Sequence, residues 1–192
     1  FFICNCKKSS QEALSKNPTE VQLVTQKAKE WQFGNIALTH AENIVSFGPR
    51  PAQSRELEMA RQYITKAMQA SGWEVKRQAF TAETPRGSMQ FVNLYARFKS
   101  EGESSELVWK KRHRGVLGAH IDTKKIPGIN YLGAVDAAGS VGALLEIADF
   151  LAEHDHEIAK KLEIVFFDGE EAITEFMSYG SDQVQRDGLY GS

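Results

Sequence analysis

Residues 162–171 read LEIVFFDGEE, a mostly apolar run that ends in a cluster of acidic side chains. Short apolar runs that stop at a turn signal, here Asp168-Gly169, are typical of a buried strand. The segment therefore predicts a strand at about residues 162–167. It also places Asp168, Glu170 and Glu171 directly beyond the carboxyl end of that strand.

A second apolar run, GVLGAH at residues 115–120, predicts another buried strand upstream. Between the two runs, residues 139–153 are rich in small and apolar residues and predict a helix. A strand, a helix and a strand at this spacing indicate a right-handed parallel crossover.

Further upstream, residues 73–80 and 89–98 alternate as strands do, and the turn residues 84–87 (TPRG) lie between them. This pattern predicts an antiparallel hairpin. Apolar stripes predict helices at about residues 20–31, 35–46 and 54–70, and residues 100–106 read as a polar loop. The fold class that follows is α/β. We expect a three-layer sandwich whose mixed, mainly parallel sheet carries an antiparallel edge hairpin.

The bulk composition limits the possible functions. The 192 residues carry a formal net charge of -2, whereas proteins that bind nucleic acid normally have a basic excess. The basic run at residues 110–114 precedes a strand and reads as a solvated loop. No segment has the roughly 18 uninterrupted apolar residues of a membrane span. We expect no nucleic-acid partner and no transmembrane segment.

The chain starts FFICNCKK, a short apolar stub with two cysteines followed by polar residues. This start is typical of the end of a secretory or lipoprotein signal, but it is equally typical of a disordered terminus. We expect residues 1–19 to be a flexible lead-in or signal remnant, with Cys4 or Cys6 as a possible lipid anchor. If the start is a signal remnant, we expect the protein to be secreted, periplasmic or anchored to the outer side of a membrane. We expect residues 20–192 to form the N-terminal part of one larger domain.

Three groups of chemically active residues follow the predicted strands and loops: His120 with Asp122, then Asp136, then Glu170 with Glu171. Ligands of open α/β sheets bind beyond the carboxyl ends of the strands. Taken singly, Asp136 is better explained as a helix cap, and the glutamates as solvated residues. Their common position on one rim favours a zinc site, because Zn²⁺ binds imidazole nitrogen and carboxylate oxygen.

These motifs resemble the zinc peptidases of family M28, which include bacterial leucyl-type aminopeptidases, and most closely the glutaminyl-peptide cyclotransferase branch. The family pattern reads here AHIDTK at residues 119–124, GAVD at residues 133–136 and IVFFDGEEA at residues 164–172. The segment DGLYGS at residues 187–192 and the edge hairpin are also similar to the cyclotransferase branch.

The resemblance implies roles for individual residues. Asp136 and Glu171 would ligate zinc, Glu170 would be the general acid and base, and Phe176 would line the substrate pocket. A third ligand, a histidine, is expected beyond Ser192, so we expect the catalytic domain to be truncated at its C-terminus. Asp122 would orient His120, or, if two zinc ions bind, His120 would become a ligand and Asp136 a bridge.

The implied function is conversion of the N-terminal glutamine of peptides or proteins to pyroglutamate with release of ammonia, using one zinc ion. One alternative is an M28 aminopeptidase with two zinc ions, which hydrolyses N-terminal residues. Another is a binding module that kept the fold and lost the chemistry. The intact Glu170-Glu171 pair disfavours this last alternative.

Overall fold

The computed structural model describes residues 2–4, 22, 26–27, 33–171 and 173. Most of the helix predicted at residues 20–31, the residue Phe176, the residue Cys6 and the segment at residues 187–192 lie outside this part. The roles predicted for them stay predictions.

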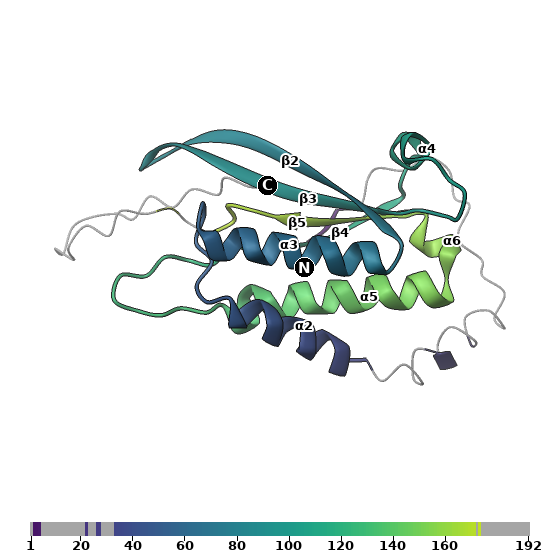
Figure 1. The fold of residues 1–192 in the computed structure, drawn as a ribbon, viewed down its shortest axis with the longest axis horizontal. Coiled ribbons are helices and arrows are strands. Elements are labelled where there is room, and N and C mark those ends of the chain that lie inside the picture. The colour runs from purple at the N-terminus through teal and green to yellow at the C-terminus, as the bar shows by residue number, and fades with distance from the viewer. Residues whose placement is uncertain (1, 5–21, 23–25, 28–32, 172, 174–192) are drawn as a thin grey trace.

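A single five-stranded sheet forms the centre of the described structure (Figure 1), in the spatial order β1-β4-β5-β3-β2. Its strands are β1 (Phe2–Cys4), β2 (Trp73–Thr84), β3 (Gly87–Phe98), β4 (Gly115–His120) and β5 (Leu162–Phe167). The two buried strands and the edge hairpin lie where the sequence predicts them. β1, in contrast, is a strand within the segment that we expected to be a flexible lead-in.

The sheet is mixed, as expected, but within the described residues it is not mainly parallel. The pair β4–β5 is parallel, whereas β1–β4, β3–β5 and β2–β3 are antiparallel. The hairpin is the main reason. Its strand β3 lies between β2 and β5 and is antiparallel to both, so antiparallel pairing extends into the middle of the sheet. The α/β class and the parallel crossover are confirmed.

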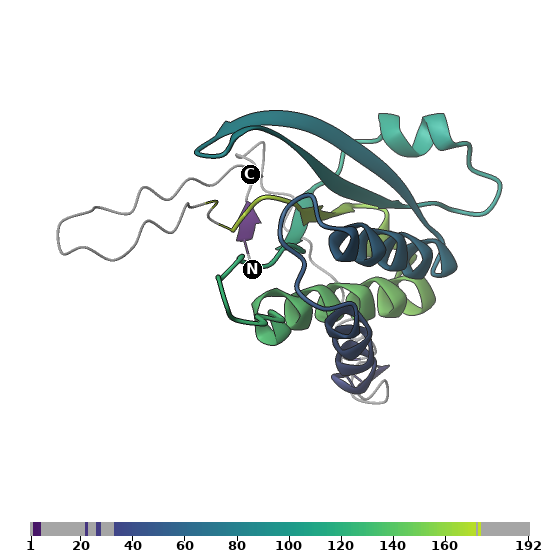
Figure 2. The same ribbon diagram turned by 60° about the vertical axis from the view of Figure 1, so that its left-hand side comes forward.

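Three long helices lie on one face of the sheet (Figures 1 and 2): α2 (Asn35–Ser46), α3 (Arg55–Ala70) and α5 (Ser140–His154). The short helix α6 (His156–Ala159) follows α5. Two of the expected layers, the sheet and one helical layer, are thus seen. Helix α3 begins where the sequence predicts it, because the Ser54 hydroxyl accepts a hydrogen bond from the Leu57 amide at 3.0 Å.

Close packing joins α2 to α5. A Cβ atom at Gly142 would lie 2.2 Å from the carbonyl oxygen of Ala37, so only glycine permits this approach. Nearby, the buried carboxylate of Glu146 accepts hydrogen bonds from the amides of Gly34 (2.9 Å) and Ala37 (3.3 Å). Glu146 therefore caps the start of α2, whose own first turn has no acidic residue.

Helix α4 (Ser105–Lys110) was not predicted. The sequence reads as a polar loop there, but the Ser104 hydroxyl accepts from the Leu107 amide at 3.4 Å and starts one short helix. Within the described residues, no helix combines the length and the apolar character that crossing a bilayer requires.

Candidate metal centre

The parallel pair β4–β5 brings the predicted site residues to one rim of the sheet. Its register places His120 opposite Phe167, so both strands end at the same level. The Ile121 amide then donates to the Phe167 carbonyl at 2.9 Å and extends the pairing by one step. The residues that follow each strand consequently run side by side.

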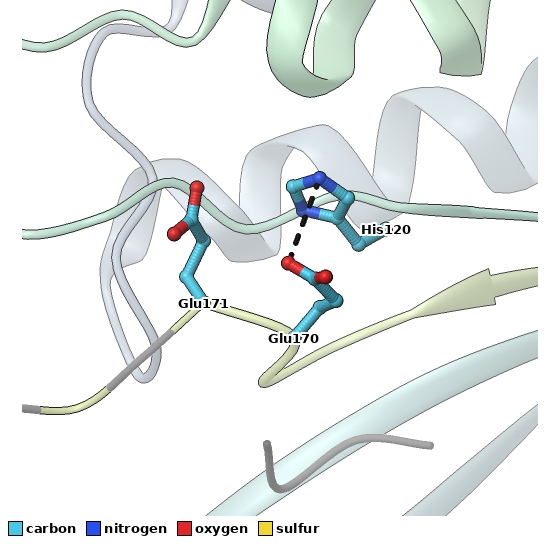
Figure 3. Close-up of side chains that lie close together, drawn as sticks. All are labelled: His120, Glu170 and Glu171. Atoms are coloured by element: carbon cyan, nitrogen blue, oxygen red, sulfur yellow. Dashed lines mark ion pairs between the residues drawn. The ribbon is translucent and has the colours of Figure 1, made fainter. Parts of the chain in front are cut away.

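His120, Glu170 and Glu171 gather at this rim (Figure 3). One potential ligand atom from each lies within 4.8 Å of the others. Nε2 of His120 is 3.8 Å from a carboxylate oxygen of Glu170. One imidazole and two carboxylates are a donor set that suits Zn²⁺, whose protein ligands are nitrogen and oxygen at about 2.0–2.2 Å.

Asp136 reaches the same group through His120, because its Oδ1 lies 2.7 Å from His120 Nε2. It lies in the irregular helical turn η1 (Ala134–Gly139), which joins the long loop after β4 to α5. Gly133 makes this turn possible: its φ is +56°, and a Cβ there would lie 2.4 Å from the Asp136 carbonyl oxygen. Asp136 is thus beside the three-residue group but is not one of its members.

Asp122 lies behind His120 and is 1% exposed. Its Oδ1 is 3.5 Å from Nδ1 of His120, so the prediction that these two side chains converge is confirmed. Burial lowers the pKa of His120, but its hydrogen bonds to Asp122 and Asp136 outweigh this effect and raise the pKa to about 9. The metal-free imidazole is therefore a cation at neutral pH.

The remaining carboxylates repel one another. The pKa of Glu171 is raised, first by burial and then by the negative charges of Asp122 and Asp136. Asp136 thus adds to the negative charge around Glu171. A bound cation would reduce the repulsion between these neighbouring carboxylates.

A cavity of about 450 Å³ adjoins the acidic group. Its walls include Glu171 and Asp122 beside the acidic group, Ser54 just before α3, and Arg86 and Met89 at the tip of the β2–β3 hairpin. The hairpin tip and the loop after β4 lie at the same end of the molecule (Figure 1). A substrate can thus lie beside the candidate ligands.

Arg50, which sequence reasoning missed, ties the two loops of the site together. Its side chain is fully buried and donates to the backbone carbonyl groups of Ile44, Gly48, Ile121 and Gly133 at 3.0–3.4 Å. Its amide also donates to the Thr123 hydroxyl at 2.7 Å. The strand end at Ile121 and the loop that carries Asp136 are thereby held against the end of α2.

Asp168 was recognised only as part of an acidic cluster, but it anchors the strand end before the two glutamates. It is fully buried, and its Oδ2 accepts from Arg61 at 2.5 Å and from the Val92 amide at 2.8 Å. The available signal was weak: Arg61 is a charged residue beside the apolar stripe of α3.

Comparison with known proteins gives a consistent result. The model of peptidase family M28 matches residues 93–192 of this chain. A glutaminyl-peptide cyclotransferase of Drosophila melanogaster is 30% identical over 148 residues, which are 75% of this chain and 37% of that protein.

Solved structures agree with the sequence match. The glutaminyl cyclase of Macrostomum lignano has a TM-score of 0.65 and 26% identity, covering 97% of this chain and 50% of that one. A Zn-dependent exopeptidase of Parabacteroides distasonis has a TM-score of 0.59 and 28% identity, covering 77% of this chain and 51% of that one. The chain thus spans about half, or less, of the length of these proteins.

Proposed function

We propose, from the premise that the chain belongs to peptidase family M28, that the protein is a zinc-dependent glutaminyl-peptide cyclotransferase. Its substrates would be peptides and proteins with an N-terminal glutamine. The observation that carries the proposal is the meeting of two adjacent glutamates with His120 and Asp136 at one rim: potential ligand atoms of His120, Glu170 and Glu171 lie within 4.8 Å of one another, and Asp136 Oδ1 lies 2.7 Å from the same imidazole. The cyclotransferases among its relatives support this choice within the family.

In the proposed reaction, the α-amine of the substrate attacks the carbon of its own γ-carboxamide. A carbon–nitrogen bond forms and closes the ring, the bond to the amide nitrogen breaks, and ammonia leaves. Glu170 takes a proton from the attacking amine and returns it to the leaving nitrogen. Because nucleophile and carbonyl belong to one residue, holding the side chain in the cyclising conformation supplies much of the rate.

Asp136 and Glu171 would hold the zinc ion together with a histidine beyond Ser192. When bound, zinc polarises the γ-carbonyl group toward attack. The cavity beside Glu171 would receive the rest of the peptide, with the hairpin tip at Arg86 as one of its walls.

A direct assay tests the proposal. Full-length protein would be incubated with a glutaminyl peptide and, separately, with aminoacyl-nitroanilides, while ammonia and nitroaniline are measured. We expect ammonia without nitroaniline, and one zinc ion per chain by metal analysis. Nitroaniline without ammonia would overturn the proposal.

An aminopeptidase with two zinc ions is the second candidate. It is favoured by one observation: His120 is itself a member of the ligand group, as a ligand of a second metal would be. His120 and Asp136, which now contact each other, would then both be among the residues that hold the ions. Two zinc ions per chain and release of nitroaniline would support this candidate.

A further inference from the structure

The carboxylate of Asp122 contacts the backbone of both glutamates. Its Oδ1 accepts from the Glu170 amide at 3.4 Å, and its Oδ2 accepts from the Glu171 amide at 3.1 Å. The same Oδ1 faces His120 at 3.5 Å. One side chain, 1% exposed, therefore contacts all three residues of the group formed by His120, Glu170 and Glu171.

We propose that Asp122 is a positioning residue for the segment Glu170-Glu171, beyond its expected part in orienting His120. Two successive amides converge on its two oxygens, which fixes where the backbone of both glutamates lies relative to β4. The distance between the imidazole and the two carboxylates then follows from one buried contact. This inference rests on the proposed zinc site.

Both the shape and the acceptor character of the side chain matter. Asparagine has the same shape, but its NH₂ group would face one of the two amides and donor would meet donor. Glutamate keeps the charge, but its longer side chain places the oxygens elsewhere in a closely packed site. Neither residue can accept from both amides in the present arrangement.

Asp168 does not duplicate this role. Its contacts are with Arg61 and the Val92 amide, and its own amide donates to Asn93 at 2.9 Å. Asp168 therefore fixes the end of β5 against β3 and α3. The backbone of Glu170 and Glu171, in contrast, is held by Asp122, which follows β4.

Glu146 supplies a matched control for loss of stability. It is 2% exposed, and like Asp122 it accepts from two backbone amides, those of Gly34 and Ala37. Those amides belong to the start of α2 and not to the ligand group. Glu146→Gln should thus lower the free energy of unfolding without changing the metal site.

The experiment compares wild type, Asp122→Asn, Asp122→Glu and Glu146→Gln as full-length proteins. Zinc affinity is measured by competition with a chromophoric chelator, and stability by urea unfolding. We expect both Asp122 variants to bind zinc 10- to 100-fold more weakly, with Glu146→Gln at the wild-type affinity. Wild-type zinc affinity in Asp122→Asn would overturn the inference, as would an equal loss in Glu146→Gln.

Hydrogen exchange of the metal-free proteins provides a readout that needs no zinc. The amides of Glu170 and Glu171 should exchange at least about tenfold faster in Asp122→Asn than in Glu146→Gln. Equal exchange would refute the positioning role.

Failure of the proposed function gives a different result. Wild type that binds zinc but releases no ammonia refutes the cyclotransferase reaction alone, and wild type that binds no zinc refutes the metal site.

Discussion

Arg61 and Asp168 form a buried ion pair that joins helix α3 to the residue directly after β5, with 2.5 Å between Nη2 and Oδ2. Asp168 stands two residues before Glu170. The candidate catalytic segment is therefore anchored on one side by α3 and on the other by Asp122. Arg61 also contacts Glu58, which in turn pairs with Arg77 of β2.

The Glu58 pairs predict a pH dependence of stability. Hydrogen bonding to Arg77 lowers the pKa of Glu58 from 4.5; burial opposes this effect, and Arg61 adds to it. Because the folded pKa lies below the unfolded one, the stabilisation is present above about pH 4.5 and is lost as the pH falls. We expect Glu58→Gln to be less stable than wild type at pH 7 by under about 1 kcal/mol. The difference should shrink toward pH 3 in urea unfolding; a difference that grows would contradict the assignment.

Replacing Arg50 should destabilise the fold strongly. Arg50→Met leaves buried carbonyl groups, including those of Ile121 and Gly133, without a donor, and each such loss costs roughly 1–3 kcal/mol. We expect urea unfolding to show a total loss of at least about 2 kcal/mol. Arg55→Met, at an exposed position of α3, is the control and should stay within about 0.5 kcal/mol of wild type.

Gly169 should tolerate no side chain. Its φ is +76°, and a Cβ would lie 2.6 Å from the ring of Phe91. Gly87 has a φ of +91° with nothing within 4 Å of the same position, so Gly87→Ala carries the backbone cost, roughly 1–2 kcal/mol, without the clash. We expect Gly169→Ala to lose clearly more stability than Gly87→Ala, and to lose ammonia release as Glu170 shifts. Equal effects of both variants would show that the Phe91 contact is unimportant.

Glu170→Gln should abolish turnover while leaving zinc binding and folding intact. Removal of a general acid and base lowers the rate by about 10²–10⁴-fold, and glutamine keeps the size of the side chain. Glu157→Gln, on the exposed end of α6, is the control and should react like wild type in the ammonia assay. Unchanged activity in Glu170→Gln would remove Glu170 from its proposed role and favour a binding function.

The local parts of this structure could be predicted from sequence. The central strands follow from short apolar runs, α2 and α3 from apolar stripes, and α5 from its small and apolar residues. His120 and Asp122 converge because they are two positions apart at the end of a strand. Helix α4 was not predicted, because its six residues are too few to show a periodic pattern.

Contacts between distant residues could not be predicted. Arg50 contacts Ile121 across 71 positions, and Arg61 contacts Asp168 across 107. A single sequence does not reveal which distant carbonyl or carboxylate a buried arginine will meet. A common rim for His120, Asp136 and the two glutamates was predicted from their positions beyond the strand ends, but the direct contact between His120 and Asp136 required the folded chain.

The β2–β3 hairpin has a practical consequence, because its tip forms a wall of the cavity. Ser88 is exposed and borders that cavity, yet it belongs to none of the acidic groups. The sequence has only two cysteines, Cys4 and Cys6. Once these are replaced, Ser88→Cys provides one site for a fluorophore. Entry of a peptide into the cavity should then change the fluorescence emission of this label.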